Sequence, residues 1–286
     1  MSGISNFSVV IPCFNEEKYI RDCIQSILNQ TLLPSNLIIV NDGSIDKTVA
    51  IVEEIKENSN LLKIVHTDKK ASFEPGAKIV QAFKVGLSTL NEWDVVFKID
   101  ADVRLPSNYF QEVISLYESD NMIGMVGGLA YIKKKGKLVY ESISSKEHLR
   151  GPIKSYQKSC FEAIGGMRET IGWDTIDEIL AEYYGYKVKI IKDLKVILAK
   201  PTGFRYRKSH ASKHGLAMYK MNYGFMLAII ATSKTSFKKK SLSTFFQTMK
   251  AFTKAYINKT PKAVNKKEGA FVRDYRWTKI KQKISF

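Results

Sequence analysis

The chain has 286 residues, of which 44% are hydrophobic and 26% carry a charge, so it can build a sizeable core and is not a disordered polymer. Its formal net charge of +17 lies mostly near the end. Residues 232–286 hold fifteen Lys and Arg against two acidic residues, a net charge of +13.

Cysteines and apolar runs exclude several classes of protein. The three cysteines form no CxxC pair, which argues against a disulfide framework or a cysteine zinc site and fits a reducing cytoplasm. The first residues lack the pattern of a signal peptide. The longest apolar stretch, 225–231, is far shorter than the ~20 residues that span a bilayer. We therefore expect a cytoplasmic protein, either soluble or peripheral on the inner face of the membrane.

Short β-branched runs alternate with helical patterns through the first hundred residues. They predict strands at 8–12, 37–40, 62–66 and 94–99, and helices after a capping Asn15, at 48–55 and at 76–90. This alternation is typical of an α/β fold with a mainly parallel sheet flanked by helices and joined by right-handed crossovers.

The second half is less regular. It predicts strands at 125–132 and 137–143, a helix at 155–164 closed by two glycines, a helix at 175–184, and strands near 187–191 and 195–199. From Ala211 onward the pattern is helical, with one apolar face that runs from Leu242 through Phe252 to Tyr256.

Three polar loops follow predicted strands of the first half: Phe14–Glu16, Asn41–Ser44 and Asp100–Asp102. Ligands of parallel sheets bind beyond the carboxyl ends of the strands. All three loops should therefore meet at one edge of the sheet.

The carboxylates in these loops allow two interpretations each. Asp100 and Asp102 are two residues apart, and carboxylates this close repel unless a cation lies between them; oxygen ligands of this kind suit Mg²⁺ or Mn²⁺. An acidic turn that caps a helix remains open. Asp42 could accept the ring N–H of a base or simply form a turn, and Glu16 could reach a ribose or favour a helix start.

Taken in order, these motifs resemble the family 2 glycosyltransferases. The resemblance rests on Phe7-Ser-Val-Val-Ile-Pro-Cys-Phe-Asn-Glu-Glu17, Ile39-Val-Asn-Asp-Gly-Ser44 and Lys98-Ile-Asp-Ala-Asp102, then on Gly165-Gly166 and Gly172-Trp-Asp-Thr-Ile-Asp-Glu178 before Gly185-Tyr186. Together they cover about residues 7–200.

The resemblance implies a GT-A fold, a nucleotide-diphosphate-sugar donor, a divalent metal (Mg²⁺ or Mn²⁺) and inversion at the anomeric carbon. Asp102 would hold the metal. The other residues that it implies at the donor are Pro12, Phe14 and Asp42 around the base, and Glu16 and Asp100 near the base or ribose. The basic Lys78 is a further candidate for a phosphate contact, with a plain surface position as the alternative.

The catalytic base of such enzymes falls in an acidic motif at a helix start, about eleven residues before a Gly-aromatic pair. Asp174 has that position, with Trp173 in place of the more usual Glu. Asp177 and Glu178 are the alternatives, and either also suits the first turn of a helix.

Some features depart from the family pattern. Val103 and Lys84 stand where an Asp and an Asn are common, and no Gln-x-x-Arg-Trp motif follows the base at the distance found in processive synthases. His210 and His214 lie among basic residues, which disfavours a cation there, so we exclude both from the metal site.

The implied organisation is a GT-A catalytic domain over 1–205, divided into a nucleotide-sugar-binding half (1–106) and an acceptor half (107–205). A basic amphipathic helical extension follows over 206–286. Its aromatic face could pack on the domain or lie on an anionic membrane surface with the lysines outward.

We expect a sugar transferase that acts on a cell-envelope or lipid-linked glycan. A metal-dependent nucleotidyltransferase is one alternative, but no early phosphate-binding loop supports it. A non-enzymatic nucleic-acid-binding protein is another. It would leave the acidic loops unexplained, because carboxylates repel a phosphate backbone, and we therefore expect no nucleic-acid partner.

Overall fold

The computed structural model describes residues 3–67, 76–143, 145–201 and 210–284. Its first half is a parallel sheet in the order β3-β2-β1-β4. The strands are β1 (Phe7–Cys13), β2 (Asn36–Asn41), β3 (Leu62–His66) and β4 (Val95–Ile99). β1, β2 and β4 are buried on both faces and are mostly apolar, whereas β3, at the edge of the sheet, is only partly buried. All four strands were predicted.

The second half extends the same sheet in mixed directions. β8 (Ile153–Gln157) pairs antiparallel with β4, and the order continues through β6 (Ile123–Lys134) and β9 (Lys187–Leu198) to β5 (Val103–Arg104). β7 (Lys137–Tyr140) pairs antiparallel with β6.

Two predictions for the second half were wrong in detail. The expected helix at 155–164 begins as strand β8, and only Lys158–Ala163 is helical, as α5. Its polar residues Ser155 and Lys154 are buried because partners in neighbouring elements bind them. The two strands expected near 187–191 and 195–199 are the single strand β9, whose register against β6 shifts between Gly127 and Leu129.

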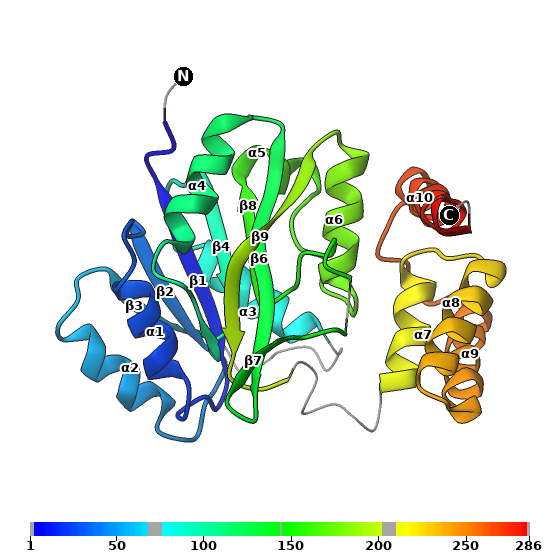
Figure 1. Ribbon diagram of the computed structural model, residues 1–286, viewed down its shortest axis with the longest axis horizontal. Coiled ribbons are helices and arrows are strands. Elements are labelled where there is room, and N and C mark those ends of the chain that lie inside the picture. The colour runs from blue at the N-terminus through cyan, green and yellow to red at the C-terminus, as the bar shows by residue number, and fades with distance from the viewer. Residues whose placement is uncertain (1–2, 68–75, 144, 202–209, 285–286) are drawn as a thin grey trace.

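Helices cover both faces of the sheet (Figure 1). One core lies under α1 (Ile20–Leu28), α2 (Thr48–Lys56) and α4 (Tyr109–Ser119). The other lies under α3 (Ala77–Leu87), α5 and α6 (Trp173–Tyr183). The alternation of side chains along β1 explains both cores, because Val9 and Ile11 enter the first and Val10 enters the second.

Asn15 does not cap the first helix, contrary to the prediction. The helix begins at Ile20, with Tyr19 at its N-cap. Asn15 instead has a φ of 54°, and its side-chain oxygen accepts the Ile45 N–H at 2.9 Å. This side chain is therefore used to join two loops rather than to end a helix.

The basic extension forms four helices in the part of the chain that is described: α7 (His210–Lys220), α8 (Phe225–Lys238), α9 (Leu242–Ile257) and α10 (Lys266–Ile284). α7 and α9 approach closely at Gly215, where an added Cβ would lie 2.1 Å from the Thr248 carbonyl oxygen. α10 packs on α6, with the Phe271 and Tyr183 rings 5.2 Å apart. Part of the extension is thus continuous with the second core.

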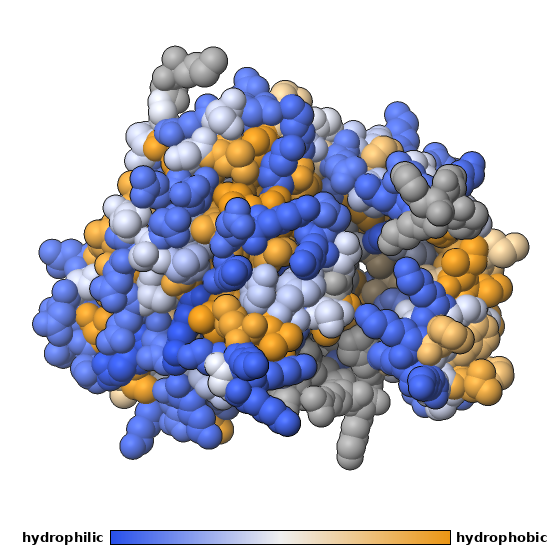
Figure 2. All heavy atoms as spheres, in the orientation of Figure 1, coloured by the Kyte–Doolittle hydropathy of each residue, from blue (hydrophilic) through white to orange (hydrophobic). Residues whose placement is uncertain are grey.

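The apolar face predicted for α9 is buried in one part and exposed in another. Phe252 is fully buried, whereas Leu242, Phe246 and Tyr256 are exposed. Hydrophobic side chains gather at the right of Figure 2, over the region where Figure 1 draws α8 and α9. The predicted domain boundary at 205–206 lies outside the described residues. So do Arg205, Arg207 and Lys208, three of the basic residues near His210 and His214 in the sequence. Within the described ranges, no helix is long and apolar enough to cross a membrane.

Candidate active site

The predicted loops meet at the carboxyl edge of the parallel strands. The backbone N–H of Asn15 donates to Ser44 Oγ at 3.0 Å, and the N–H of Glu16 donates to Thr48 Oγ1 at 2.8 Å. Asp42 is held by Thr67, whose hydroxyl donates to its carboxylate at 2.8 Å. These bonds fix the loop after β1 against the loop after β2.

A cavity of about 330 Å³ opens between these loops. All seven residues that the sequence assigned to the donor and the metal line this cavity: Pro12, Phe14, Glu16, Asp42, Lys78, Asp100 and Asp102. Such a volume lies within the range of small-molecule sites. Phe14 is 45% exposed, so its ring is available to a planar ligand.

Lys200 also lines the cavity, and the sequence did not single it out. Its Nζ lies 2.6 Å from Glu16 Oε2 and 3.8 Å from Asp102 Oδ2. The position follows from the sheet, because the Ala199 N–H donates to the Asp102 carbonyl beside the β5–β9 pairing. The only sequence signal for Lys200 is its position directly after the strand predicted near 195–199.

The charged form of Asp102 is destabilised by its surroundings. Burial and the neighbouring Asp100 carboxylate raise the pKa of Asp102 to about 7, and the Lys200 ammonium only partly opposes this shift. A carboxylate in this state gains from a cation nearby.

The residues fit a hard divalent cation with few protein ligands. Asp102 would supply an oxygen ligand in the cavity that it lines, and no group of three or more His, Cys, Asp or Glu residues that could hold a metal occurs in the described part of the chain. Mg²⁺ is commonly bound by one or two carboxylates together with substrate phosphates. His214 lies on α7, and the side chain of His210 is outside the described residues.

Two buried lysines lie side by side behind the cavity. Lys98 on β4 and Lys154 on β8 are direct partners in the sheet. Lys98 forms an ion pair with Asp100 and donates to the Gly151 carbonyl at 2.9 Å. Its Nζ lies 5.2 Å from the centre of the Trp173 ring, and that of Lys154 lies 5.8 Å from it.

Lys154 determines which carboxylate of α6 is buried. It donates to Asp177 Oδ1 and to the Asp174 carbonyl, each at 2.6 Å, and the Tyr156 hydroxyl donates to Asp177 Oδ2 at 2.5 Å. Asp177 is 1% exposed. This carboxylate anchors α6 on β8 and offers no surface to a substrate.

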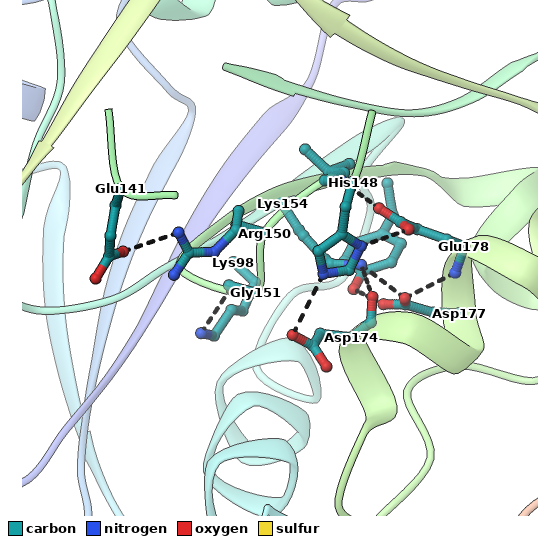
Figure 3. Close-up of polar contacts among 11 residues, drawn as sticks. Lys98, Glu141, His148, Arg150, Gly151, Lys154, Asp174, Asp177 and Glu178 are labelled. Carbon is teal, nitrogen blue, oxygen red and sulfur yellow. Dashed lines mark hydrogen bonds and ion pairs between the residues drawn. The ribbon is translucent and has the colours of Figure 1, made fainter. Parts of the chain in front are cut away.

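The other two acidic residues of the motif face His148 (Figure 3). Glu178 Oε2 lies 2.7 Å from His148 Nδ1, and Asp174 Oδ2 lies 3.9 Å from His148 Nε2. The Asp174 side chain is 36% exposed, against 13% for Glu178. Asp174 is therefore the carboxylate of this motif most accessible to a substrate.

Asp174 adjoins the cavity without lining it. A Cβ added at Gly151 would lie 3.4 Å from the Asp174 Cβ, and the next residue, Pro152, lines the cavity. The sequence predicted Asp174 and the donor loops but not Lys98, Lys154 or His148. A lysine within the apolar run of β4 was the one available signal, since a buried lysine needs a partner.

Comparison with known proteins places these features in a family. The model of "Glycosyl transferase family 2" matches residues 8–169. EpsH of Bacillus subtilis, a protein named as a glycosyltransferase, is 26% identical over 155 residues, which cover 54% of this chain and 42% of EpsH. The poly-beta-1,6-N-acetyl-D-glucosamine synthase of Staphylococcus aureus is 24% identical over 136 residues, which cover 48% of this chain and 31% of the synthase. The chain thus spans less than half the length of these relatives.

Solved structures share the fold. Residues 1–349 of S. aureus TarS, in complex with UDP-GlcNAc, superpose with a TM-score of 0.58 at 18% identity, covering 76% of this chain and 64% of that one. The mannosyltransferase PcManGT from Pyrobaculum calidifontis, in complex with GDP-Man and Mn²⁺, gives a TM-score of 0.60 at 16% identity, covering 93% and 78%. The predicted GT-A fold is confirmed.

Replacing Lys154 should destabilise the protein strongly. Lys154→Met leaves the Asp177 charge buried without its cation, which typically lowers the free energy of unfolding by about 3–5 kcal/mol. A second change, Asp177→Asn, should restore most of this loss. Urea denaturation measures both, with Lys187→Met, from an exposed ion pair, as a control expected within about 1 kcal/mol of wild type. A single variant as stable as the control would contradict the anchoring role.

Proposed function

Because this chain belongs to glycosyl transferase family 2, we propose that it transfers a sugar from a nucleotide-diphosphate donor to an acceptor hydroxyl. The convergence of the seven predicted residues on one cavity carries the proposal. TarS and PcManGT, which share the fold, have structures in complex with UDP-GlcNAc and with GDP-Man and Mn²⁺, respectively.

The donor occupies the cavity with its base at the ends of β1 and β2. Phe14 and Pro12 border the base, and Asp42, held by Thr67, accepts a ring N–H from it. Glu16 and Asp100 lie on the ribose side. Lys78, exposed at the first turn of α3, faces the phosphates.

Asp102 holds a divalent cation, Mg²⁺ or Mn²⁺, together with the diphosphate. A bound cation of this kind neutralises the charge that develops on a leaving diphosphate. Lys200 gives the site a positive charge beside the same carboxylates.

Asp174 acts as the general base. Its carboxylate takes the proton of the acceptor hydroxyl while that oxygen attacks the anomeric carbon. A single displacement of this kind inverts the anomeric centre. The geometry supports Asp174 over Asp177, which is buried and paired with Lys154, and over Glu178, which binds His148 and the backbone of Leu149.

We infer that the acceptor is a cell-envelope or lipid-linked glycan. The name of the S. aureus relative, a poly-beta-1,6-N-acetyl-D-glucosamine synthase, supports a glycan acceptor. A surface on the α8–α9 hairpin, which we call the hairpin face, supports a lipid-linked one. Its most exposed apolar side chains are Met226, Phe237, Leu242, Phe246 and Ile257, with exposed fractions of 61–88%.

The charge of the hairpin suits an anionic membrane. Residues 225–259 contain seven lysines and no acidic residue, and every one of these lysines is exposed. Apolar side chains with interleaved lysines bind the interface of anionic lipid. The hairpin joins the catalytic domain through α7, whose Ala217 lies close to Gly172, two residues before Asp174. A peripheral position on the inner face of the membrane would therefore bring lipid-linked acceptors near the base.

Calorimetric titration of UDP and GDP tests the donor site. One of the two should bind with micromolar affinity in the presence of Mn²⁺, and Asp102→Ala should weaken that binding roughly 10- to 100-fold. Because the pKa of Asp102 is raised to about 7, protons compete with the metal, so binding at pH 6 should be about five- to tenfold weaker than at pH 8.

The control for this titration is Asp120→Ala, which lies at the C-terminal end of α4 and does not line the cavity. This variant should bind as wild type does. Binding of DNA or RNA with no binding of either nucleotide would contradict the transferase and favour the nucleic-acid alternative. Transfer of a nucleotidyl group, in place of a sugar, would favour the metal-dependent nucleotidyltransferase.

Asp174→Asn tests the base. We expect release of UDP from UDP-N-acetylglucosamine, or of GDP from GDP-mannose, to slow about 100- to 10,000-fold, with nucleotide affinity unchanged within about twofold. A chromatographic assay of the released nucleotide measures the rate. An Asp174→Asn variant that keeps its rate, while Glu178→Gln loses it, would transfer the role to Glu178.

Sedimentation with lipid vesicles tests the hairpin face. The wild-type protein should sediment with phosphatidylglycerol-containing vesicles and not with phosphatidylcholine alone, because each lysine near an anionic surface contributes about 1 kcal/mol. Phe237→Ser together with Phe246→Ser should lower the vesicle partition constant about 10- to 100-fold. Leu33→Ser, an exposed apolar residue elsewhere, is the control. Equal binding of the double variant and the control would exclude the hairpin face.

A further inference from the structure

His148 lies between two carboxylates of α6 and has no role in the site as described so far. It belongs to the segment that joins β7 to β8, and its side chain is 21% exposed. Asp174 and Glu178 are four residues apart on α6, so they share one face of the helix. Figure 3 shows the imidazole ring between them.

Glu178 fixes the orientation of the ring. One carboxylate oxygen lies 2.7 Å from His148 Nδ1, and the other accepts the backbone N–H of Leu149, the next residue. An ionised carboxylate only accepts hydrogen bonds, so Nδ1 must carry the proton. In the neutral ring Nε2 is then unprotonated, and it is the nitrogen that faces Asp174, 3.9 Å away.

Charged groups of the described residues near this cluster are paired with other partners. Lys154 is bound to Asp177, and Arg150, two residues after His148, forms a buried ion pair with Glu141 at 2.8 Å. From α10, the Tyr275 hydroxyl donates to Glu182, at 3.2 Å. Among the residues that the structure describes, the charges that His148 faces directly are those of Asp174 and Glu178.

We propose that His148 is a positioning residue that accepts, from Asp174, the proton removed from the acceptor hydroxyl. The proposal rests on the function proposed above. The acceptor O–H bond breaks as its oxygen bonds to the anomeric carbon, and the bond from that carbon to the diphosphate oxygen breaks. The proton passes to an Asp174 oxygen and then to His148 Nε2, while the electron pair leaves with the nucleoside diphosphate.

The two carboxylates make this transfer favourable. An imidazole is ordinarily a stronger base than a carboxylate, and the imidazolium formed here lies between two negative charges. Glu178 would then act on the ring as an aspartate does in a catalytic triad, by fixing its tautomer and stabilising its charge. The separation of 3.9 Å is longer than a hydrogen bond, so the Asp174 carboxylate must turn toward the ring, or one water must link them. The partly exposed ring returns the proton to solvent.

His148→Gln separates this role from simple anchoring of the segment. Glutamine can still donate to Glu178 but cannot take up a proton. We expect kcat for release of UDP or GDP from the sugar nucleotide to fall about 10- to 100-fold, with KM and nucleotide affinity unchanged within about twofold. Added imidazole should restore part of the rate of His148→Ala. Glu147→Gln, an exposed neighbour in the same segment, should behave as wild type.

Several results would overturn the proposal. A His148→Gln variant that keeps kcat within twofold of wild type would exclude a proton-accepting role. A loss of kcat with an equal loss of affinity and thermal stability, and no rescue by imidazole, would leave His148 only an anchoring role. The ¹⁵N spectrum of the ring tests the premise without any turnover, because an Nε2-protonated neutral tautomer would contradict it. Wild-type protein that releases neither nucleotide would refute the function proposed above, and the proposal for His148 with it, whereas a wild-type rate with unaffected variants would refute the role of His148 alone.

Discussion

Two buried lysines hold the halves of the candidate site together. Lys98 and Lys154 are paired across β4 and β8, and each is almost completely buried. Burying a charge costs several kcal/mol unless a partner offsets it. Lys98 takes its partner, Asp100, from the donor loop, whereas Lys154 takes Asp177 from the helix that bears the proposed base. The Trp173 ring lies near both. The positions of the donor loop and of α6 are thereby coupled through one point in the sheet.

In the cavity, by contrast, the negative charge of Asp102 is only partly offset by a partner. Asp102 is largely buried beside Asp100, with Lys200 as a partner at 3.8 Å, and its pKa is raised to about 7. Perturbed groups of this kind cluster where ligands bind, because the charge that is costly without the ligand is favourable with it. The same contrast separates two acids of the α6 motif: Asp177 is buried and paired with Lys154, while Asp174 is partly exposed and lies 3.9 Å from a histidine ring.

What the sequence predicted was local in the chain. Strands β1, β2 and β4 were found because each is a mostly apolar run. The loops that follow them were found because parallel strands bring their ends to one edge. The seven cavity residues followed from those loops and from the family resemblance. The same reasoning gave Asp174 as the base, a role that remains a prediction.

What it missed depends on pairings between distant segments. β8 reads as the start of a helix because Lys154 and Ser155 are polar, and their partners on α6, α4 and β6 are known only in the fold. Lys200 reaches Asp102 through the pairing of β5 with β9, almost a hundred residues apart. The two strands expected within β9 correspond to an irregularity in its pairing with β6, whose register shifts between Gly127 and Leu129. The backbones approach closely there, because an added Cβ at Gly128 would lie 2.4 Å from the Leu194 carbonyl oxygen. His148 gave no signal, because a lone histidine in a polar segment is usually a surface residue.

A crystal structure with the nucleotide that binds and Mn²⁺ would test the central claim most directly, namely that the loops after β1, β2 and β4 form a donor site. The account predicts an anomalous manganese peak within about 2.2 Å of an Asp102 oxygen, the base between Phe14 and Asp42, and the diphosphate beside Lys200. A nucleotide bound elsewhere, or bound in this cavity with its phosphates directed away from Asp102, would contradict it.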